Sequence, residues 1–502
     1  MATKSRSSSP IEKADDVEAI NIVSDDPDAE FGGTEARKKL ERRLLWKLDA
    51  RMFILVIIYI LNYIDRNNAA AARLRGFESD LHLEGQQFAT LLSILYVGYI
   101  IMQIPSNMIL NHMGKPSLQL PLCMIIWGIL SILTDGRYQA VYASIDAFIS
   151  YSFVGALLTR FFLGFMEAAF FPGSLFLISK WYKRSETGAR TALLYGGNII
   201  SNAFGALIAS GILDRMQGKL GQSAWRWLFF IEGSLTVFCA ICAIFLLPDF
   251  PTTTRGRWLS DIERRLAMRR MEEDVGVGDE KETEAGRKGS GLWMAMTDWK
   301  VWWMAFAMLS QVVALSFNAF FPTLTATLGF DTTVSLLLCA PPFVTAAILG
   351  YVNSRHSDKT GERFWHMTVP YLTGIVGFII AMSTMNTAAR YVSLFLMAQQ
   401  YVGFIVLYTW TSNTFPRPPS KRAVAVAFVN AWSQIGNVAG SYTWSSSWGP
   451  TYRYSYAICI ATTGLAIIML YILKLHLLSL NRKFEKEEEA RGATEKGFRY
   501  LV

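Results

Sequence analysis

Four ionisable side chains of this sequence fall inside long apolar segments, where charge is rare. Asp65 and Arg66 are adjacent near the end of one segment, and Arg160 and Glu167 lie in another. A charge at the centre of a bilayer costs roughly 2.5–3.5 kcal/mol on insertion scales, so such groups must be paired or line a wet cavity. The spacing of about two helical turns places Arg160 and Glu167 on one helix face. A further acid, Glu232, lies early in a third apolar segment.

The depth of each residue along its segment brings acid and base together. At roughly 1.5 Å per residue, Asp65 lies about 21 Å from Arg51, which leaves it about 9 Å below the outer edge of a core of about 30 Å. Arg160 lies about 10 Å below the same edge on a segment that runs the opposite way. Glu167 lies about 10 Å deeper than Arg160. The spacing therefore predicts an Asp65–Arg160 pair near the outer surface, with Glu167 beneath it near the midplane.

This arrangement suits linked binding of a proton and an anion. A buried carboxyl group without a fixed cation binds a proton near neutral pH. A buried arginine stays charged and can bind a carboxylate through two hydrogen bonds. Protonation of an acid that shares the arginine would then free the arginine for an anionic substrate. The alternative is a static salt bridge that fixes helix packing; we favour the functional interpretation because ionisable groups inside membranes are functional by default.

The elements that position these residues are apolar segments of membrane-spanning length. Of the 502 residues, 52% are hydrophobic and 18% charged, against about 25% charged in soluble domains. Mean hydropathy is +0.26. The sequence predicts an all-α membrane protein with twelve transmembrane helices in two groups of six. The segments are 51–72, 87–110, 117–134, 153–178, 189–213, 226–248, 300–322, 333–353, 366–385, 391–412, 422–444 and 454–478.

The polar stretches divide the chain into five parts. We expect a disordered tail (1–48), an N-terminal six-helix bundle (49–248), a linker (249–298), a C-terminal bundle (299–478) and a second tail (479–502). Lysine and arginine gather before the first segment and in alternate connections, which places both termini and the linker in the cytosol. The start of the linker, 258–271, can form an amphipathic helix. We interpret it as a solvated cytosolic helix; a membrane-surface helix is the alternative.

Several function classes are disfavoured. The net charge of +8 reflects basic connections rather than the basic face of a soluble nucleic-acid-binding domain, so no nucleic-acid partner is expected. No catalytic constellation is present, so an enzyme is not expected. The five histidines are scattered at segment ends or in loops, and we expect no metal site. No cofactor is predicted other than the proton as a coupling ion.

The C-terminal half carries polar and aromatic groups in place of internal charge. Tyr408, Asn430 and Asn437 lie within its apolar segments. Hydrogen bonding between helices is one explanation for such residues. The alternative, which we adopt as a prediction, is that these three side chains contact substrate in a cavity between the halves.

The layout of six segments, a basic linker and six segments resembles the major facilitator superfamily, whose two pseudo-symmetric bundles hold substrate between them. The stretch 354–363 resembles the family's signature for the loop between spans 8 and 9. This resemblance implies that Asp358, Arg355 and Arg363 gate the inner face. The copy of this signature at 111–115 is degenerate and lacks the acid.

Six further motifs lie at 47–51, 63–67, 104–107, 160–173, 225–229 and 247–251. Through these motifs the sequence resembles, within that superfamily, the anion:cation symporters in their fungal allantoate-permease branch. The resemblance implies proton-coupled uptake of a small organic anion by alternating access, with a carboxylate vitamin, an allantoate-like anion or a sulfur-containing anion as substrate. In such relatives, residues matching Asp65 and Glu167 take protons, and residues matching Arg66 and Arg160 handle the substrate carboxylate and the internal ion pair.

The resemblance further implies a plasma-membrane location, and we expect a monomer. Two other hypotheses are a proton-driven exporter of a metabolite or drug and a non-transporting nutrient sensor. An exporter of neutral or cationic compounds has little use for Arg66 and Arg160. One departure from the family is the long connection 135–152, which we expect to be an outward loop; a retained intron in the gene model is the alternative.

Overall fold

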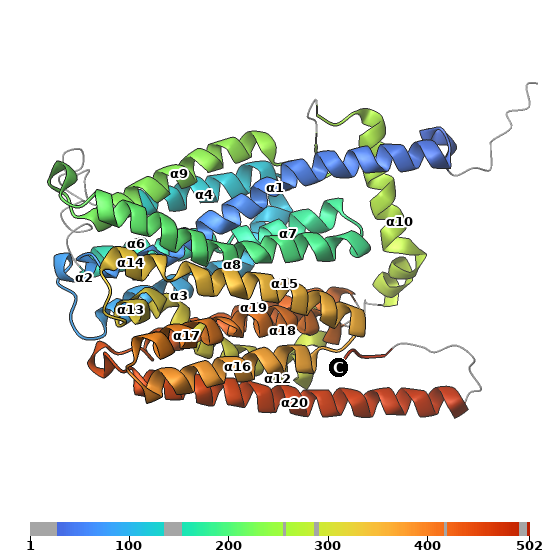
Figure 1. Cartoon of the computed structure of the whole chain (residues 1–502). Coiled ribbons are helices and arrows are strands. Elements are labelled where there is room, and N and C mark those ends of the chain that lie inside the picture. The colour runs from blue at the N-terminus through green and yellow to red at the C-terminus, as the bar shows by residue number, and fades with distance from the viewer. Residues whose placement is uncertain (1–27, 135–152, 255–257, 286–290, 416–418, 491–498) are drawn as a thin grey trace, which may run out of the picture.

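The computed structural model describes residues 28–134, 153–254, 258–285, 291–415, 419–490 and 499–502, which are helical and contain no strand. Figure 1 shows the helices running side by side, with α10 lying across one end of the bundle and α2 at the other. We refer to these as the α10 end and the α2 end. The elements of the first half are η1 (Ala29–Phe31), α1 (Thr34–Arg73), α2 (Phe77–Asp80), α3 (Gln87–Met113), α4 (Pro116–Leu133), α6 (Phe153–Glu167), α7 (Phe170–Trp181), α8 (Arg184–Arg215), η3 (Lys219–Gly221) and α9 (Ala224–Leu246).

The linker contains a charged helix, α10 (Asp261–Ala285), and the short helix α11 (Gly291–Met296). The elements of the second half are α12 (Trp299–Ala314), η5 (Leu315–Phe320), α13 (Phe321–Ala326), α14 (Thr332–Leu337), α15 (Ala340–Thr360), α16 (Phe364–Ser383), α17 (Thr387–Ala398), α18 (Gln400–Thr414), α19 (Pro419–Ser441), η6 (Ser446–Trp448) and α20 (Arg453–Ala490).

The apolar segments predicted from the sequence are helical wherever the structure describes them. Ten stretches of the described residues are long and apolar enough to cross a membrane. Of the two remaining predicted segments, 51–72 lies within α1, and 422–444 is helical up to Ser441, where α19 ends. The all-α membrane fold is therefore confirmed. The limits of the two bundles stay a prediction.

Several predicted segments are broken rather than continuous. The segment 153–178 divides into α6 and α7 after Glu167, and 391–412 divides into α17 and α18 at Gln399. The segment 300–322 passes from α12 into the 3-10 turn η5. Irregular backbone within a membrane is tolerated where it is buried in protein or lines a cavity. These breaks therefore mark the interior of the molecule as the place to look for a site.

The N-terminal tail was expected to be disordered up to residue 48, but from Thr34 onward it forms the first turns of α1. Leu44 and Leu48 on this extension are fully buried. Ion pairs also hold it, because Lys47 contacts Glu263 of α10 at 2.7 Å. Burial and charge pairing together provide the tertiary contacts that stabilise a helix with a polar sequence.

The α10 helix is docked at this end by a network of ion pairs. Arg270 of α10 is fully buried, and its guanidinium contacts Glu41 and Glu186 at 2.6 Å each. Arg37 also pairs with Glu273 of α10. Because α10 packs against both α1 and α7, the first part of the linker is a helix bound to the N-terminal half.

Candidate functional site

Five buried ionisable residues gather in the first half of the chain. They come from α1, α6 and α9. Each is almost completely shielded from solvent: Asp65 (1% exposed), Arg66 (7%), Arg160 (3%), Glu167 (1%) and Glu232 (2%). Such groups are rarely buried unless they are paired, so their partners decide what the cluster can do.

Arg66 and Glu167 form the ion pair of this cluster. Nη2 and Nε of Arg66 donate to Oε2 of Glu167 at 2.7 and 3.1 Å. The rings of three tyrosines surround the guanidinium carbon at 4.9, 5.5 and 5.0 Å, which is within cation–π range. They are Tyr63, Tyr96 and Tyr99.

The predicted Asp65–Arg160 ion pair is not formed among the described residues. Oδ2 of Asp65 accepts a hydrogen bond from Thr236 Oγ1 at 2.9 Å. Arg160 Nη1 lies 3.4 Å from the main-chain oxygen of Arg66. The two depths were predicted to match, but consecutive helix residues point about 100° apart. In the structure it is therefore Arg66 that faces an acid of α6.

Several polar atoms of the cluster are left without a hydrogen-bond partner among the described residues. They are Oδ1 of Asp65, Nη2 of Arg160, Oε1 of Glu167 and both carboxyl oxygens of Glu232. Buried polar atoms in native proteins are nearly always bonded, so each such atom calls for an explanation. Arg160 thus has a free donor, Nη2, while the Glu167 carboxylate holds Arg66. This arrangement could bind an anion.

Close packing of α3 against α6 fixes the position of Arg160 and Glu167. A side chain at Gly164 would place its Cβ 1.9 Å from the main-chain oxygen of Leu95. Only glycine fits there, which explains why Gly164 follows Arg160 by one turn. Glu167 is the last residue of α6, so its carboxylate lies at the break in this segment.

The structure places the three predicted residues of the C-terminal half unequally. The ring of Tyr408 in α18 stacks on Tyr195 of α8, with centroids 5.2 Å apart, and so joins the two halves. Asn437 donates from Nδ2 to Oε1 of Gln434 at 2.8 Å within α19. Asn430 is half-buried two turns earlier on α19. Tyr408 thus reaches the interface between halves, whereas the contact of Asn437 lies within its own helix.

The predicted gating residues lie where α15 meets α16. Arg363 Nη1 donates to Oδ1 of Asp358 at 2.7 Å and to Oγ of Ser357 at 3.0 Å. Arg355 instead donates to the hydroxyl of Tyr351 at 3.0 Å. The pair Asp358–Arg363 is therefore brought together, and Arg355 stays apart on the preceding turn.

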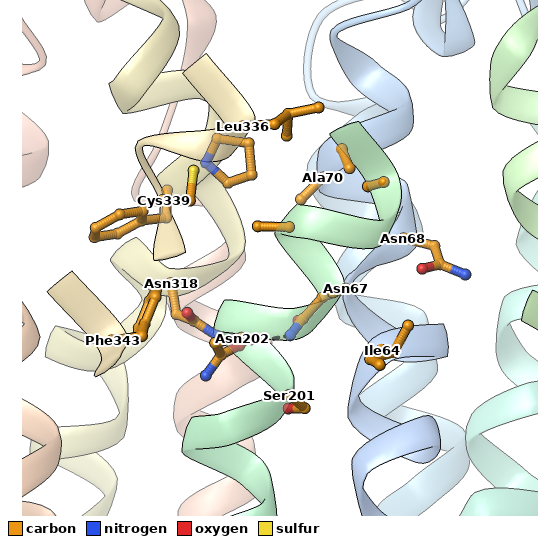
Figure 2. A pocket seen from close by; sticks show the side chains of 16 residues that line it. Ile64, Asn67, Asn68, Ala70, Ser201, Asn202, Asn318, Leu336, Cys339 and Phe343 are labelled. Carbon is orange, nitrogen blue, oxygen red and sulfur yellow. Dashed lines mark hydrogen bonds between the residues drawn. The ribbon is translucent and has the colours of Figure 1, made fainter. Parts of the chain in front are cut away.

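A polar bridge between the halves was not predicted. Asn202 of α8 accepts hydrogen bonds at Oδ1 from Asn67 at 2.8 Å and from Asn318 at 3.2 Å. The three amides line a cavity of about 40 Å³ between α1, α8 and the second half. Figure 2 shows Asn67, Asn202 and Asn318 close together there. The signal available in the sequence was Asn198 and Asn202, spaced one turn apart in an apolar segment.

The connection 135–152 and its predicted outward loop lie outside the described residues. In the part of the chain that the structure describes, no group of three His, Cys, Asp or Glu could hold a metal ion. The prediction that the protein needs no metal or cofactor is not tested by this.

Comparison with known proteins finds one matching family model and similar proteins that are named as transporters. Residues 55–441 match the family model of the Major Facilitator Superfamily. The MFS-type transporter cnsO of Penicillium expansum is 30% identical over 441 residues, covering 85% of this chain and 82% of that protein. A protein of Agrobacterium vitis, named as a proposed tartrate transporter, is 28% identical over 407 residues, covering 80% of this chain and 87% of that protein. The xylose transporter XylE from E. coli, solved in a partially occluded inward-open conformation, has a TM-score of 0.61 at 14% identity over 84% of this chain and 97% of that one.

Proposed function

The chain belongs to the major facilitator superfamily of membrane transporters, and we propose that it couples proton movement to the uptake of a small organic anion. It is a multi-pass membrane protein and a transporter of small molecules rather than an enzyme. The proton coupling and the anionic substrate are the parts proposed here.

The observation that carries the proposal is the Arg66–Glu167 pair beside a free donor of Arg160. Two buried arginines can bind a carboxylate through charge-assisted hydrogen bonds. While Glu167 is ionised it occupies Arg66. Once Glu167 is protonated, it releases Arg66 to the substrate. Each ligand then favours binding of the other, as linkage requires.

Alternating access supplies the transport step. At the α2 end the halves are joined by the Asn67–Asn202–Asn318 bridge and by Tyr442, just after α19, whose hydroxyl bonds Thr90 of α3 at 3.1 Å. We propose that these contacts close the outer side and that they part when the protein opens outward. The ion pair Asp358–Arg363 would act on the opposite side, as part of the inner gate.

The positive-inside rule supports a cytosolic α10 end, because α1 and α8 begin there with several lysines and arginines. We further propose that the protein works as a monomer in the plasma membrane. The relative named as a proposed tartrate transporter supports an organic anion as substrate.

The test is uptake of labelled organic anions by cells that express the protein, at about pH 5 and about pH 7.5, with and without a protonophore. The panel includes carboxylate vitamins, allantoate, tartrate and a sulfonate, with a neutral sugar and an organic cation as controls. We expect one anion to accumulate at the lower pH and the protonophore to abolish this accumulation. Uptake of the neutral or cationic control alone, or none with the protein confirmed at the surface, would overturn the proposal.

A further inference from the structure

The buried acid Glu232 has no part in the ion pair or in the proposed anion site. It lies eight residues from the start of α9, about 12 Å along the helix axis at 1.5 Å per residue. Asp65 lies eight residues from the end of α1, so both carboxyl groups are at about the same depth. Glu232 and Asp65 interact electrostatically, and α1 packs directly against α9.

Neither oxygen of the Glu232 carboxyl group has a hydrogen-bond partner among the described residues. The other four members of the cluster each have at least one: Arg66 and Glu167 bond each other, Asp65 bonds Thr236, and Arg160 bonds a main-chain oxygen. Glu232 is also 98% shielded from solvent, since its exposed fraction is 2%. Within the part of the chain that the structure describes, its carboxyl group therefore has no cation and no solvent to compensate a negative charge, and the amide of Asn68 is the group near enough to donate to it.

The groups that face Glu232 from neighbouring helices do not include a paired cation. On α1 they are Asp65 and the amide of Asn68. Packed against the other side of α9, α4 contains no Asp, Glu, Lys, Arg or His, only Cys123 among titratable types. On α8 the segment from 191 to 213 contributes Tyr195 and no charge. On α9 itself Arg226 lies six residues earlier, buried beside Trp225.

Arg160 is the cation of the cluster that approaches this acid from α6. Its guanidinium lies 5.3 Å from the ring of Phe229, which is one turn before Glu232. It forms no ion pair with Glu232 or Asp65 in the described residues, and its Nη2 has no partner. Arg160 interacts electrostatically with Asp65, and its contact with Phe229 places it about one turn from Glu232. An arginine in this position would be expected to bind the two carboxyl groups if both were ionised.

Tight packing holds Glu232 in this position. A Cβ at the adjacent Gly233 would lie 2.8 Å from the main-chain oxygen of Gly128 in α4. The two helices thus approach too closely for α9 to rotate its acid towards lipid. The carboxyl group must find its compensation on the α1 side, where Asp65 lies.

We propose that Glu232 and Asp65 form a carboxyl pair that shares a proton and that this pair controls whether Arg160 is available to a substrate anion. Two neighbouring carboxylates in an apolar site hold one proton between them because both cannot ionise. With the proton present, Nη2 of Arg160 stays available, which is the arrangement found in the structure. When the proton leaves to solvent, the ionised pair attracts Arg160 and displaces the anion.

This inference rests on the proposed function for its role in transport, but its test does not. The purified full chain is treated without substrate with dicyclohexylcarbodiimide, an apolar reagent that modifies protonated carboxyl groups, and the modified residues are located by mass spectrometry. We expect modification of Glu232 at neutral pH and little of Glu167. In Asp65→Asn, Glu232 no longer has a like charge to resist ionisation, so its modification at about pH 8 should fall several-fold. The exposed control Glu84→Gln should match the wild type.

Equal modification of Glu232 with and without Asp65, or modification of Glu167 in its place, would overturn the pair. A second measurement covers the case in which the reagent does not reach Glu232. The infrared carbonyl band of protonated carboxylic acids should be weaker in the Glu232→Gln variant than in the wild type. Size-exclusion chromatography first checks that this variant is folded. An unchanged band overturns the proposal. Because both measurements omit substrate, a failure of uptake alone would count against the proposed function and leave the carboxyl pair standing.

Discussion

The two halves of the molecule place different chemistry at corresponding positions. In the first half, Arg66 of the first apolar segment pairs with Glu167 of the fourth. In the second half, Gln311 of the first segment donates to Gln400 of the fourth at 2.6 Å, and both are fully buried. Glu167 ends α6 and Gln400 begins α18, so both lie at a break in the fourth segment.

The difference shows which half can respond to protons. Amide side chains do not titrate near neutral pH, whereas a buried carboxylate and its arginine exchange a proton and an ion pair. The second half repeats the geometry of the pair in neutral form. We infer that coupling of transport to protons is concentrated in the first half. The second half contributes polar side chains whose charge does not change with pH.

The largest effect should come from removing the cation of the charged pair. Arg66→Ala leaves the Glu167 carboxylate buried without its partner, which costs about 3–5 kcal/mol of stability. Thermal unfolding in detergent should show a clear fall in Tm, and uptake should be lost. The double variant Arg66→Ala/Glu167→Gln should recover most of the Tm but not the uptake. A Tm that stays low in the double variant would mean that packing, rather than the stranded charge, is responsible.

A smaller effect is expected for the neutral pair. Gln400→Leu leaves the Gln311 amide unpaired, at about 1–3 kcal/mol. It should lower Tm without changing how uptake depends on pH, because no proton site is touched. Uptake across a pH series measures this, with wild type as reference. A shifted pH profile would contradict the assignment of coupling to the first half.

The smallest effect concerns the ion pairs that dock α10. Burial works to raise the pKa of Glu263, but hydrogen bonds from Lys47 and Ser260 outweigh it and hold that pKa below its ordinary value of 4.5. A lowered pKa gives stability that is present above 4.5 and is lost as the pH falls below it. We expect the rate of hydrogen exchange in α10 to rise only below that pH. The local stability lost should be about 1 kcal/mol or less per ion pair. In Lys47→Met the pKa of Glu263 is no longer held down by Lys47, so the rise below pH 4.5 should be smaller. A rise as large as in the wild type would contradict this role for Lys47.

The sequence was sufficient for most of the elements and for the five buried charges of the first-half cluster, because apolar length and isolated ionisable residues are local signals. It was not sufficient for the pairing. Depth along a segment placed Asp65 level with Arg160, yet rotation about the helix axis, which depth does not specify, turned Arg66 towards α6 instead. The breaks after Glu167 and at Gln399 were also missed, because both lie within continuous apolar runs.

The pattern of residues in the sequence also did not predict the contacts between segments that are distant in the chain. The bridge through Asn202 joins residues from three segments. Near the C-terminus, the main-chain oxygen of Leu501 accepts a hydrogen bond from the buried Trp410 at 2.9 Å. Nothing in the polar composition of 479–502 predicted this docking. Helix 34–48 was missed for the same reason, since its stability comes from α10.

The most direct test of the account is transport by Glu167→Gln reconstituted in liposomes, using the anion that the uptake panel identifies. Glutamine occupies the place of a permanently protonated Glu167, so proton-driven accumulation should be lost while exchange of labelled for unlabelled anion continues, because exchange needs no net change in protonation. A variant that still accumulates the anion with the pH dependence of the wild type would contradict the central claim that Glu167 carries the coupling proton.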